Sequence, residues 1–245
     1  MDATLILFLI LSLIAEILGT IGGFGSSVYF VPLANLFLDF KSVLGITAVF
    51  HLSSNISKMI LFKKGLNKFL LFYIGLPAVI MVIAGGILSK YLDERILQLS
   101  FAVFIILTSL FFLWFDKFVL ASDKKNAVIG GSLSGFLAGV LGTGGAIRGI
   151  TMVAFNIEKE QFVATSAAID FAVDFSRTVV YFMNGYMHVE HLKYMIGLII
   201  IGFVGTWVGR VLLKRISQER FKTLVLVLLL GIGVFSLIRS LIQLS

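Results

Sequence analysis

The sequence contains no cysteine, only two prolines and little charge. Without cysteine, the 245-residue chain can form neither a disulfide nor a thiolate metal site. Its first charge is Asp2 and no small-residue cleavage site follows, so we expect no removable signal peptide. The motifs G-x-S-x-G, H-E-x-x-H and G-x-x-x-x-G-K-[ST] are missing as well, which argues against the enzyme classes that they mark.

Hydrophobic residues dominate what is present. They make up 59% of the chain, and charged residues only 13%, whereas a soluble domain has roughly 25% charge. This composition predicts an integral membrane protein. The net charge of +7 sits mostly in short stretches between apolar segments, so it points to membrane topology rather than to nucleic acid as a partner.

A glycine-rich stretch interrupts the first apolar run, which extends from Ala3 to Leu38. A helical crossing needs ~20 apolar residues, so this run is too long for one crossing and short for two. Glycine destabilises a helix by about 1 kcal/mol relative to alanine, so we expect a break at Gly22–Gly25 and a new helix near Ser26. A helix that begins inside a membrane directs free N–H groups and a positive dipole end at its surroundings, which suits an anion.

The same pattern returns 120 positions later, where Gly139, Gly142 and Gly145 correspond to Gly19, Gly22 and Gly25. Glycines could simply let two helices pack closely. A glycine-interrupted segment in corresponding halves of a chain is nevertheless the best sequence indication of a transporter site.

The remaining apolar segments give the two halves the same layout. We predict an all-α, polytopic membrane protein forming a single transmembrane domain over 1–245, with internal repeats at 1–120 and 125–245. Pro77 and Gly85–Gly86 are expected kink and packing points. The predicted helical segments after the first broken one are 42–62, 69–88, 96–115, 127–141, 146–157, 161–183, 194–213 and 223–244.

The basic residues between these segments test how the broken segments cross the membrane. If each broken segment returned to its starting side, 12 loop lysines and arginines would face one side and 5 the other. If each broken segment crossed the membrane once instead, this bias would disappear. In the returning arrangement, the positive-inside rule makes the side with more basic residues cytoplasmic and places both termini outside. The halves would be inverted copies, each with a re-entrant hairpin, or two short full passes, and three full helices. The richer side holds Lys63, Lys64, Lys68, Lys117, Lys124, Lys125, Lys159, Arg210, Lys214, Arg215, Arg220 and Lys222.

Several charged residues lie inside apolar segments, where each costs ~2.5–3.5 kcal/mol on insertion scales. Such residues face a protein interior or a cavity. Two polar sets share the spacing 4, 4, 3, which keeps each on one face of a helix, within an arc of about 80°. The sets are Thr47, His51, Asn55 and Lys58, and Ser166, Asp170, Asp174 and Arg177.

A buried ion-pair network is the alternative explanation for these charges. Asp174 and Arg177 are i,i+3 neighbours that could neutralise each other. This explains Lys58 less well, because its segment carries no acid. Arg148 lies close to the positive end of a short helix, so it needs a negative partner, which could be Asp170, Asp174 or a substrate anion. Glu16, one turn before the first break, could be a proton site or could extend into a water-filled cavity.

The glycine motifs also resemble a known family. Residues 22–32, GGFGSSVYFVP, resemble the first motif of the TauE/SafE family of sulfite exporters and sulfonate permeases, and residues 139–145 and 164–170 resemble its second-repeat motifs. The resemblance covers nearly the whole chain and implies a small secondary carrier of sulfur-containing anions. Arg148 and Met152 depart from the family pattern, in which aliphatic residues and a proline are more common.

We therefore predict a non-enzymatic, H⁺-linked secondary transporter of sulfite-like or sulfonate-like oxyanions in a bacterial-type inner membrane. An anion channel is the main alternative, and an intramembrane enzyme or a sensor are others. The partners are a small anion and the lipid bilayer, with no nucleic acid, cofactor or metal, and a homodimer is left open. Asp170 and Asp174 would pair with the arginines or carry the coupled proton. The predicted substrate-binding residues are Gly22, Gly23, Phe24, Gly25, Ser26, Ser27, His51, Asn55, Lys58, Gly142, Thr143, Gly144, Gly145, Arg148 and Arg177.

Overall fold

The described part of the structure, a computed structural model, is helical throughout. It covers residues 3–22, 25–62, 65–115, 120–213, 227, 230–231 and 233–238, and no strand occurs among them. Most of the predicted segment 223–244 lies outside these residues. The elements are α1 (Ala3–Gly22), α2 (Ser27–Ala34), α3 (Phe40–Leu61), α4 (Lys68–Leu70), the π-helix η1 (Leu71–Gly75), α5 (Leu76–Tyr91), α6 (Glu94–Trp114), α7 (Lys124–Leu141), α8 (Gly145–Val153), α9 (Lys159–Met183), the 3₁₀ turn η2 (Val189–His191) and α10 (Leu192–Leu213).

Several of these helices have the length and composition of membrane crossings. Within the described residues, 5 helical stretches qualify: Ala3–Ile21, Phe40–Leu61, Lys68–Tyr91, Glu94–Trp114 and Val189–Leu212. Each is at least 19 residues long, which at 1.5 Å per residue matches a hydrocarbon core of about 30 Å. The chain is therefore a multi-pass membrane protein.

Both predicted helix breaks are confirmed. Helix α1 ends at Gly22 and α2 begins at Ser27, while α7 ends at Leu141 and α8 begins at Gly145. Gly25 and Gly142 have φ angles of +85° and +76°, a region that favours glycine. A Cβ atom added at Gly142 would also lie 2.6 Å from Cδ2 of Leu44. The backbone turn and the close packing of this second break both require glycine.

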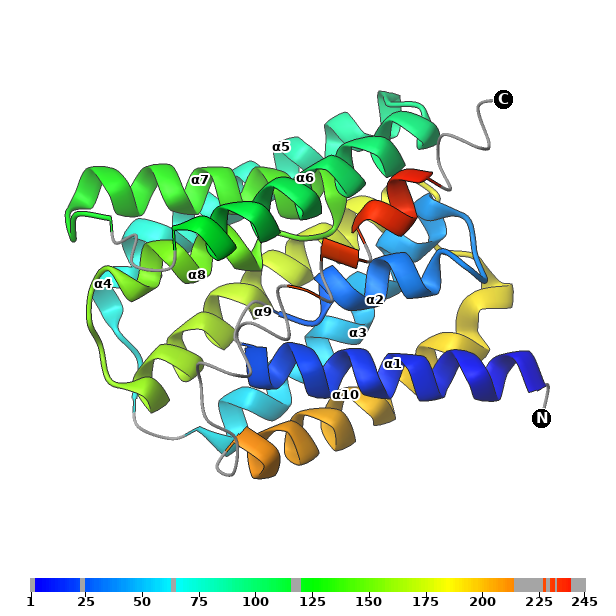
Figure 1. The fold of residues 1–245 in the computed structure, drawn as a ribbon, viewed down its shortest axis with the longest axis horizontal. Helices are drawn as coiled ribbons and strands as arrows, with labels where there is room; N and C mark the ends of the chain where they lie inside the picture. Colours follow the sequence, from blue (N-terminus) through cyan, green and yellow to red (C-terminus); the bar gives the residue numbers. More distant parts are fainter. Residues whose placement is uncertain are drawn as a thin grey trace.

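Each broken segment begins and ends at the same end of the molecule (Figure 1). At the end where α1 starts, the Phe8 ring contacts both Phe37, which follows α2, and Tyr194, at the start of α10. At the opposite end, Lys124 at the start of α7 lies over the Tyr73 ring, and Phe155, which follows α8, contacts Phe69. The two breaks therefore lie in the interior, approached from opposite ends.

Three helix pairs form the body of the protein. Helix α1 packs along α10, α5 along α7, and α3 along α9 between them (Figure 1). Close approach of α7 depends on Gly131, Gly135 and Gly139, where an added Cβ would lie 2.1–2.4 Å from carbonyl oxygens of η1 and α5. Small residues at such spacing bring membrane helices into backbone contact.

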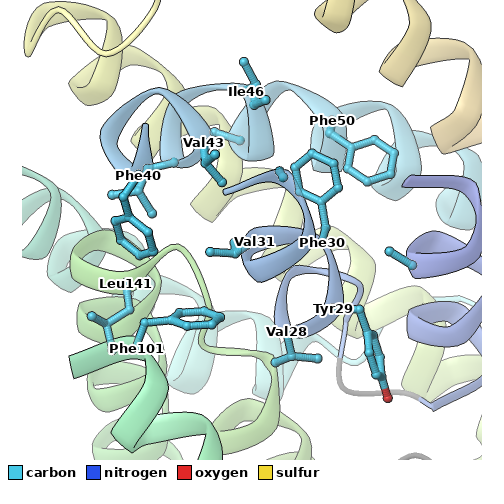
Figure 2. Packing of buried hydrophobic residues seen from close by; sticks show 14 of the residues in the cluster. Val28, Tyr29, Phe30, Val31, Phe40, Val43, Ile46, Phe50, Phe101 and Leu141 are labelled. Atoms are coloured by element: carbon cyan, nitrogen blue, oxygen red, sulfur yellow. The ribbon is translucent and has the colours of Figure 1, made fainter. Parts of the chain in front are cut away.

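Helix α2 is buried on almost every side. Val28, Tyr29, Phe30 and Val31 are at most 2% exposed and pack among side chains of α3, α6 and the end of α7 (Figure 2). A helix that is apolar all round belongs in a protein interior. This packing fixes the start of α2, and with it the first break, at the centre of the molecule.

The predicted kink at Pro77 takes the form of a π-helical turn. Residues Leu71–Gly75 form η1, directly before Pro77 near the start of α5. Proline lacks an N–H and its ring clashes with the carbonyl four residues earlier, here that of Tyr73. A wider turn relieves that clash. Gly85 and Gly86 act as packing points, as predicted, because added Cβ atoms would lie within 3 Å of Phe136 and Val180.

Candidate functional site

A small cavity lies where the two helix breaks meet. Its volume is about 30 Å³, enough for about two water molecules. Both short helices direct their first turns at it, and the N–H groups of a first turn have no partner within the helix. The lining residues are Gly25, Ser26, Ser27, His51, Asn55, Lys58, Ala138, Gly142, Gly144, Gly145, Arg148, Asp170, Val173, Asp174 and Arg177.

Arg177 holds together three elements around this cavity. Its Nε donates to Asp174 Oδ1 at 2.8 Å, and its Nη1 donates to the carbonyl oxygen of Gly142 at 2.8 Å. The other carboxylate oxygen of Asp174 accepts from Asn55 Nδ2 at 2.7 Å, which ties α9 to α3. Arg177 is only 2% exposed, so this cation is compensated entirely by protein groups.

Arg148 pairs with Asp170, which identifies its negative partner among the protein groups. Its Nη1 contacts Asp170 Oδ1, and its Nε donates to Ser166 Oγ at 3.1 Å. The Arg148 side chain is 7% exposed and that of Asp170 is 22% exposed. This pair therefore joins α8 to α9 at a more accessible edge of the cavity than the Arg177 pair.

Lys58 has an acidic partner, although its own helix carries no acid, as the sequence indicates. The acid comes from another helix, because Glu16 Oε1 of α1 lies 3.4 Å from Lys58 Nζ. Lys58 also donates to Ser54 Oγ at 2.8 Å, and Ser54 donates to the same carboxylate oxygen at 2.5 Å. Spacing within one helix could not reveal this pair, because its members come from different segments.

The hydroxyl groups of the first break have protein partners. Ser26 Oγ donates to Glu16 Oε2 at 2.5 Å and lies 3.0 Å from His51 Nε2. Ser27 Oγ donates to Thr143 Oγ1 at 3.1 Å, which links the two breaks directly. Both serines line the cavity, so either hydroxyl could be redirected to a bound anion.

A second cavity of about 50 Å³ adjoins the first. The two share Gly25, Lys58, Arg148 and Asp170, and the second extends towards Phe62 and Phe162, near the end of α3 and the start of α9. Lys58, Arg148 and Asp170 therefore separate the inner cavity from a space on the side of the 62–67 connection.

The structure brings most of the predicted site residues together. All of the predicted polar and charged side chains except Thr143 line the inner cavity, as do Gly25, Gly142, Gly144 and Gly145. Gly22 is the last residue of α1, and Gly23 and Phe24 lie outside the described residues. The prediction left out the side chains that support the site from behind, namely Glu16, Ser54, Ser166 and Thr206. Two of them carried a sequence signal: Glu16 as a carboxylate within an apolar run, and Ser166 as a member of the second polar set.

Comparison with known proteins gives one match. The family model described as sulfite exporter TauE/SafE matches residues 8–236, which include both breaks and all the cavity residues. No curated protein and no solved structure matches the chain.

Proposed function

The chain belongs to the sulfite exporter TauE/SafE family, and we propose that it is a secondary transporter that binds sulfite or a related sulfur oxyanion in the inner cavity. The observation that carries this proposal is the convergence of two helix N-termini and three cationic side chains on one buried space. Preorganised N–H dipoles and charges of this kind favour an anion inside a membrane. The second cavity would be the access route from the side of the 62–67 connection.

Charge balance supports linkage to protons. Lys58, Arg148 and Arg177 each have a carboxylate partner, so the described groups at the site sum to zero charge. An anion that enters would leave a net negative charge in a medium of low dielectric constant, which is costly. Protonation of one carboxylate would offset that charge. We propose that the carrier moves its anion together with H⁺.

Equivalent contacts support an inverted repeat of two re-entrant hairpins. If α1, α2 and α3 correspond to α7, α8 and α9, then α1 on α10 repeats the packing of α7 on α5. Asn55 and Asp174 hold the same place in the two polar sets, 119 positions apart and one residue off the register of the glycines, and they contact each other. A contact between equivalent positions is expected on an axis that relates two halves.

Single cysteines should report the proposed orientation. The native chain has no cysteine, so each variant carries one thiol. We expect Lys90→Cys and Lys193→Cys to react with a membrane-impermeant maleimide in intact cells, because their end carries few basic residues. Lys68→Cys and Lys125→Cys should react only after permeabilisation. Equal labelling of Lys90→Cys and Lys68→Cys in intact cells would contradict the orientation.

Counterflow in proteoliposomes tests the function. We expect unlabelled sulfite inside the vesicles to accelerate entry of [³⁵S]sulfite several-fold, because a carrier exchanges substrate across its alternating site. Empty liposomes and sulfate-loaded vesicles are the controls. Conductance without acceleration by internal sulfite would identify a channel, and entry equal to that of empty liposomes would rule out this substrate.

A further inference from the structure

We propose that Glu16 is the proton-binding residue of the carrier, and that its protonation frees Ser26 and Lys58 to bind the anion. This inference rests on the proposed function and adds the residue that couples the proton to the substrate. It assigns the proton-binding role to a carboxylate behind the cavity instead of to Asp170 or Asp174, which line the cavity.

Glu16 is enclosed by donors from four helices. It is 0% exposed, and its Oε1 accepts from Thr20 at 3.1 Å, Ser54 at 2.5 Å and Thr206 at 3.0 Å. The same oxygen faces Lys58, so its lone pairs are fully used. Its Oε2, in contrast, accepts from a single donor among the described residues, Ser26. Oε2 therefore has a lone pair available to bind a proton.

The charged groups around Glu16 come from few elements. Helix α3 contributes Lys58 and, through Ser26, His51. Helix α10 contributes Thr206 but no charge, since its Arg210 lies over the Phe62 ring instead. The N-cap of α2 contributes Ser26. Within the described part of the chain, Lys58 is thus the cation that balances Glu16.

A directional chain of hydrogen bonds links Glu16 to the anion site. Because Ser26 donates to Glu16, His51 Nε2 must carry the proton that it shares with Ser26 Oγ. The other ring nitrogen, Nδ1, is then an acceptor and lies 3.4 Å from Arg177 Nη2. The chain runs from Arg177 through neutral His51 and Ser26 to Glu16.

Protonation of Glu16 would change the last link of this chain. With a proton on Oε2, Glu16 would donate to Ser26 Oγ, and the Ser26 hydroxyl proton would turn towards the cavity that this residue lines. Lys58, which lines the same cavity, would lose its counter-charge at the same time. One proton would therefore supply a hydroxyl donor and an uncompensated cation to the incoming anion.

The two aspartates are worse placed for this role. Each is paired with an arginine guanidinium, so protonation of either aspartate would leave a buried arginine without its counter-charge. The Lys58 contact with Glu16 is longer, at 3.4 Å against 2.8 Å for Arg177 and Asp174. Glu16 also has no acidic equivalent in the second half of the chain, because the position 120 residues later is Phe136.

Calorimetric titration of purified protein with sulfite tests the proposal. Binding heats measured in buffers with different ionisation enthalpies give the number of protons taken up with each anion. We expect one proton per sulfite for the wild type beyond the uptake by sulfite itself, and none for Glu16→Gln. Glutamine can donate to Ser26 as the protonated acid would, so Glu16→Gln should also lose the pH dependence of affinity that is particular to the protein. Sulfite titrates identically in both samples, so the difference isolates the protein proton.

Two further variants keep the test decisive. Arg210→Ala, a change on α10 at a residue that lines neither cavity, should keep proton uptake, which controls for disturbed packing. Ser26→Ala, the second variant if Glu16→Gln does not fold, should weaken sulfite binding at least tenfold, because it removes the hydroxyl donor that the proposed protonation frees. Full proton uptake in Glu16→Gln would overturn the proposal, and its loss in Asp170→Asn would assign the proton to Asp170 instead. If the wild type bound no sulfite, the proposed substrate would be wrong and this inference would fall with it.

Discussion

Replacing Arg148 with alanine should reduce sulfite exchange by about 100-fold or more, because it removes a cation shared by the inner cavity and its access route. Truncating one partner of a buried, hydrogen-bonded charge pair costs about 2–5 kcal/mol, and each 1.4 kcal/mol is tenfold. Exchange in proteoliposomes, normalised to reconstituted protein, measures the loss. Arg210→Ala is the matched control, since Arg210 lies over Phe62 and lines neither cavity.

The double variant Arg148→Ala/Asp170→Asn separates two explanations of that loss. If Arg148 only neutralises Asp170, removal of both charges should restore exchange. If Arg148 binds the anion, the double variant should remain inactive while it elutes as a single species on size exclusion. Restored exchange in the double variant, or normal exchange in both Arg148→Ala and Lys58→Ala, would show that these charges serve packing alone.

Replacing Arg177 with methionine should have the largest effect on stability. The change leaves the Asp174 carboxylate, 5% exposed, without its cation and removes the donor to the Gly142 carbonyl. Breaking a buried pair on one side costs about 3–5 kcal/mol. We expect the melting temperature in detergent to fall on the order of 10 °C, since 1 kcal/mol corresponds to about 2–4 °C in a chain of this size.

Neutralising both partners should recover much of that loss. In Arg177→Met/Asp174→Asn no unpaired charge remains, and the amide oxygen that replaces the carboxylate can still accept from Asn55. The melting temperature should therefore rise above that of Arg177→Met, while sulfite exchange stays absent. A single variant as stable as the wild type would mean that this pair does not hold the break in place.

The sequence predicts the helix breaks well because their cause is local. Glycine at Gly25 and Gly142 permits positive φ angles wherever the rest of the chain lies. The ends of α3, α9 and α10 differ from the predicted spans by only two residues. The sequence predicts a kink at Pro77 but not that it takes the form of a π-helical turn, because relief of the proline clash depends on how neighbouring helices pack.

Helical periodicity predicts which residues of one helix face the site, but it does not predict contacts between helices. The spacing 4, 4, 3 places His51, Asn55 and Lys58 on one face, and that face does line the cavity. The acid that balances Lys58 lies on α1, 42 positions earlier in the chain, so no local pattern connects them. Serine and threonine are common in membrane helices and carry no signal that four of them converge on Glu16. The behaviour of the carboxylate therefore depends on tertiary contacts.

The contact between Asn55 and Asp174 has a consequence for how such a chain could have evolved. If the halves descend from a duplicated gene, their ancestor paired with an identical copy of itself, and this position then met its own counterpart across the axis. Two aspartates at 2.7 Å would repel, whereas two asparagines can share a hydrogen bond. Only after duplication could one copy keep an amide while the other acquired an acid. The acid that holds Arg177 would then be younger than the duplication, and a lone half of today's chain could not rebuild the site by pairing with itself.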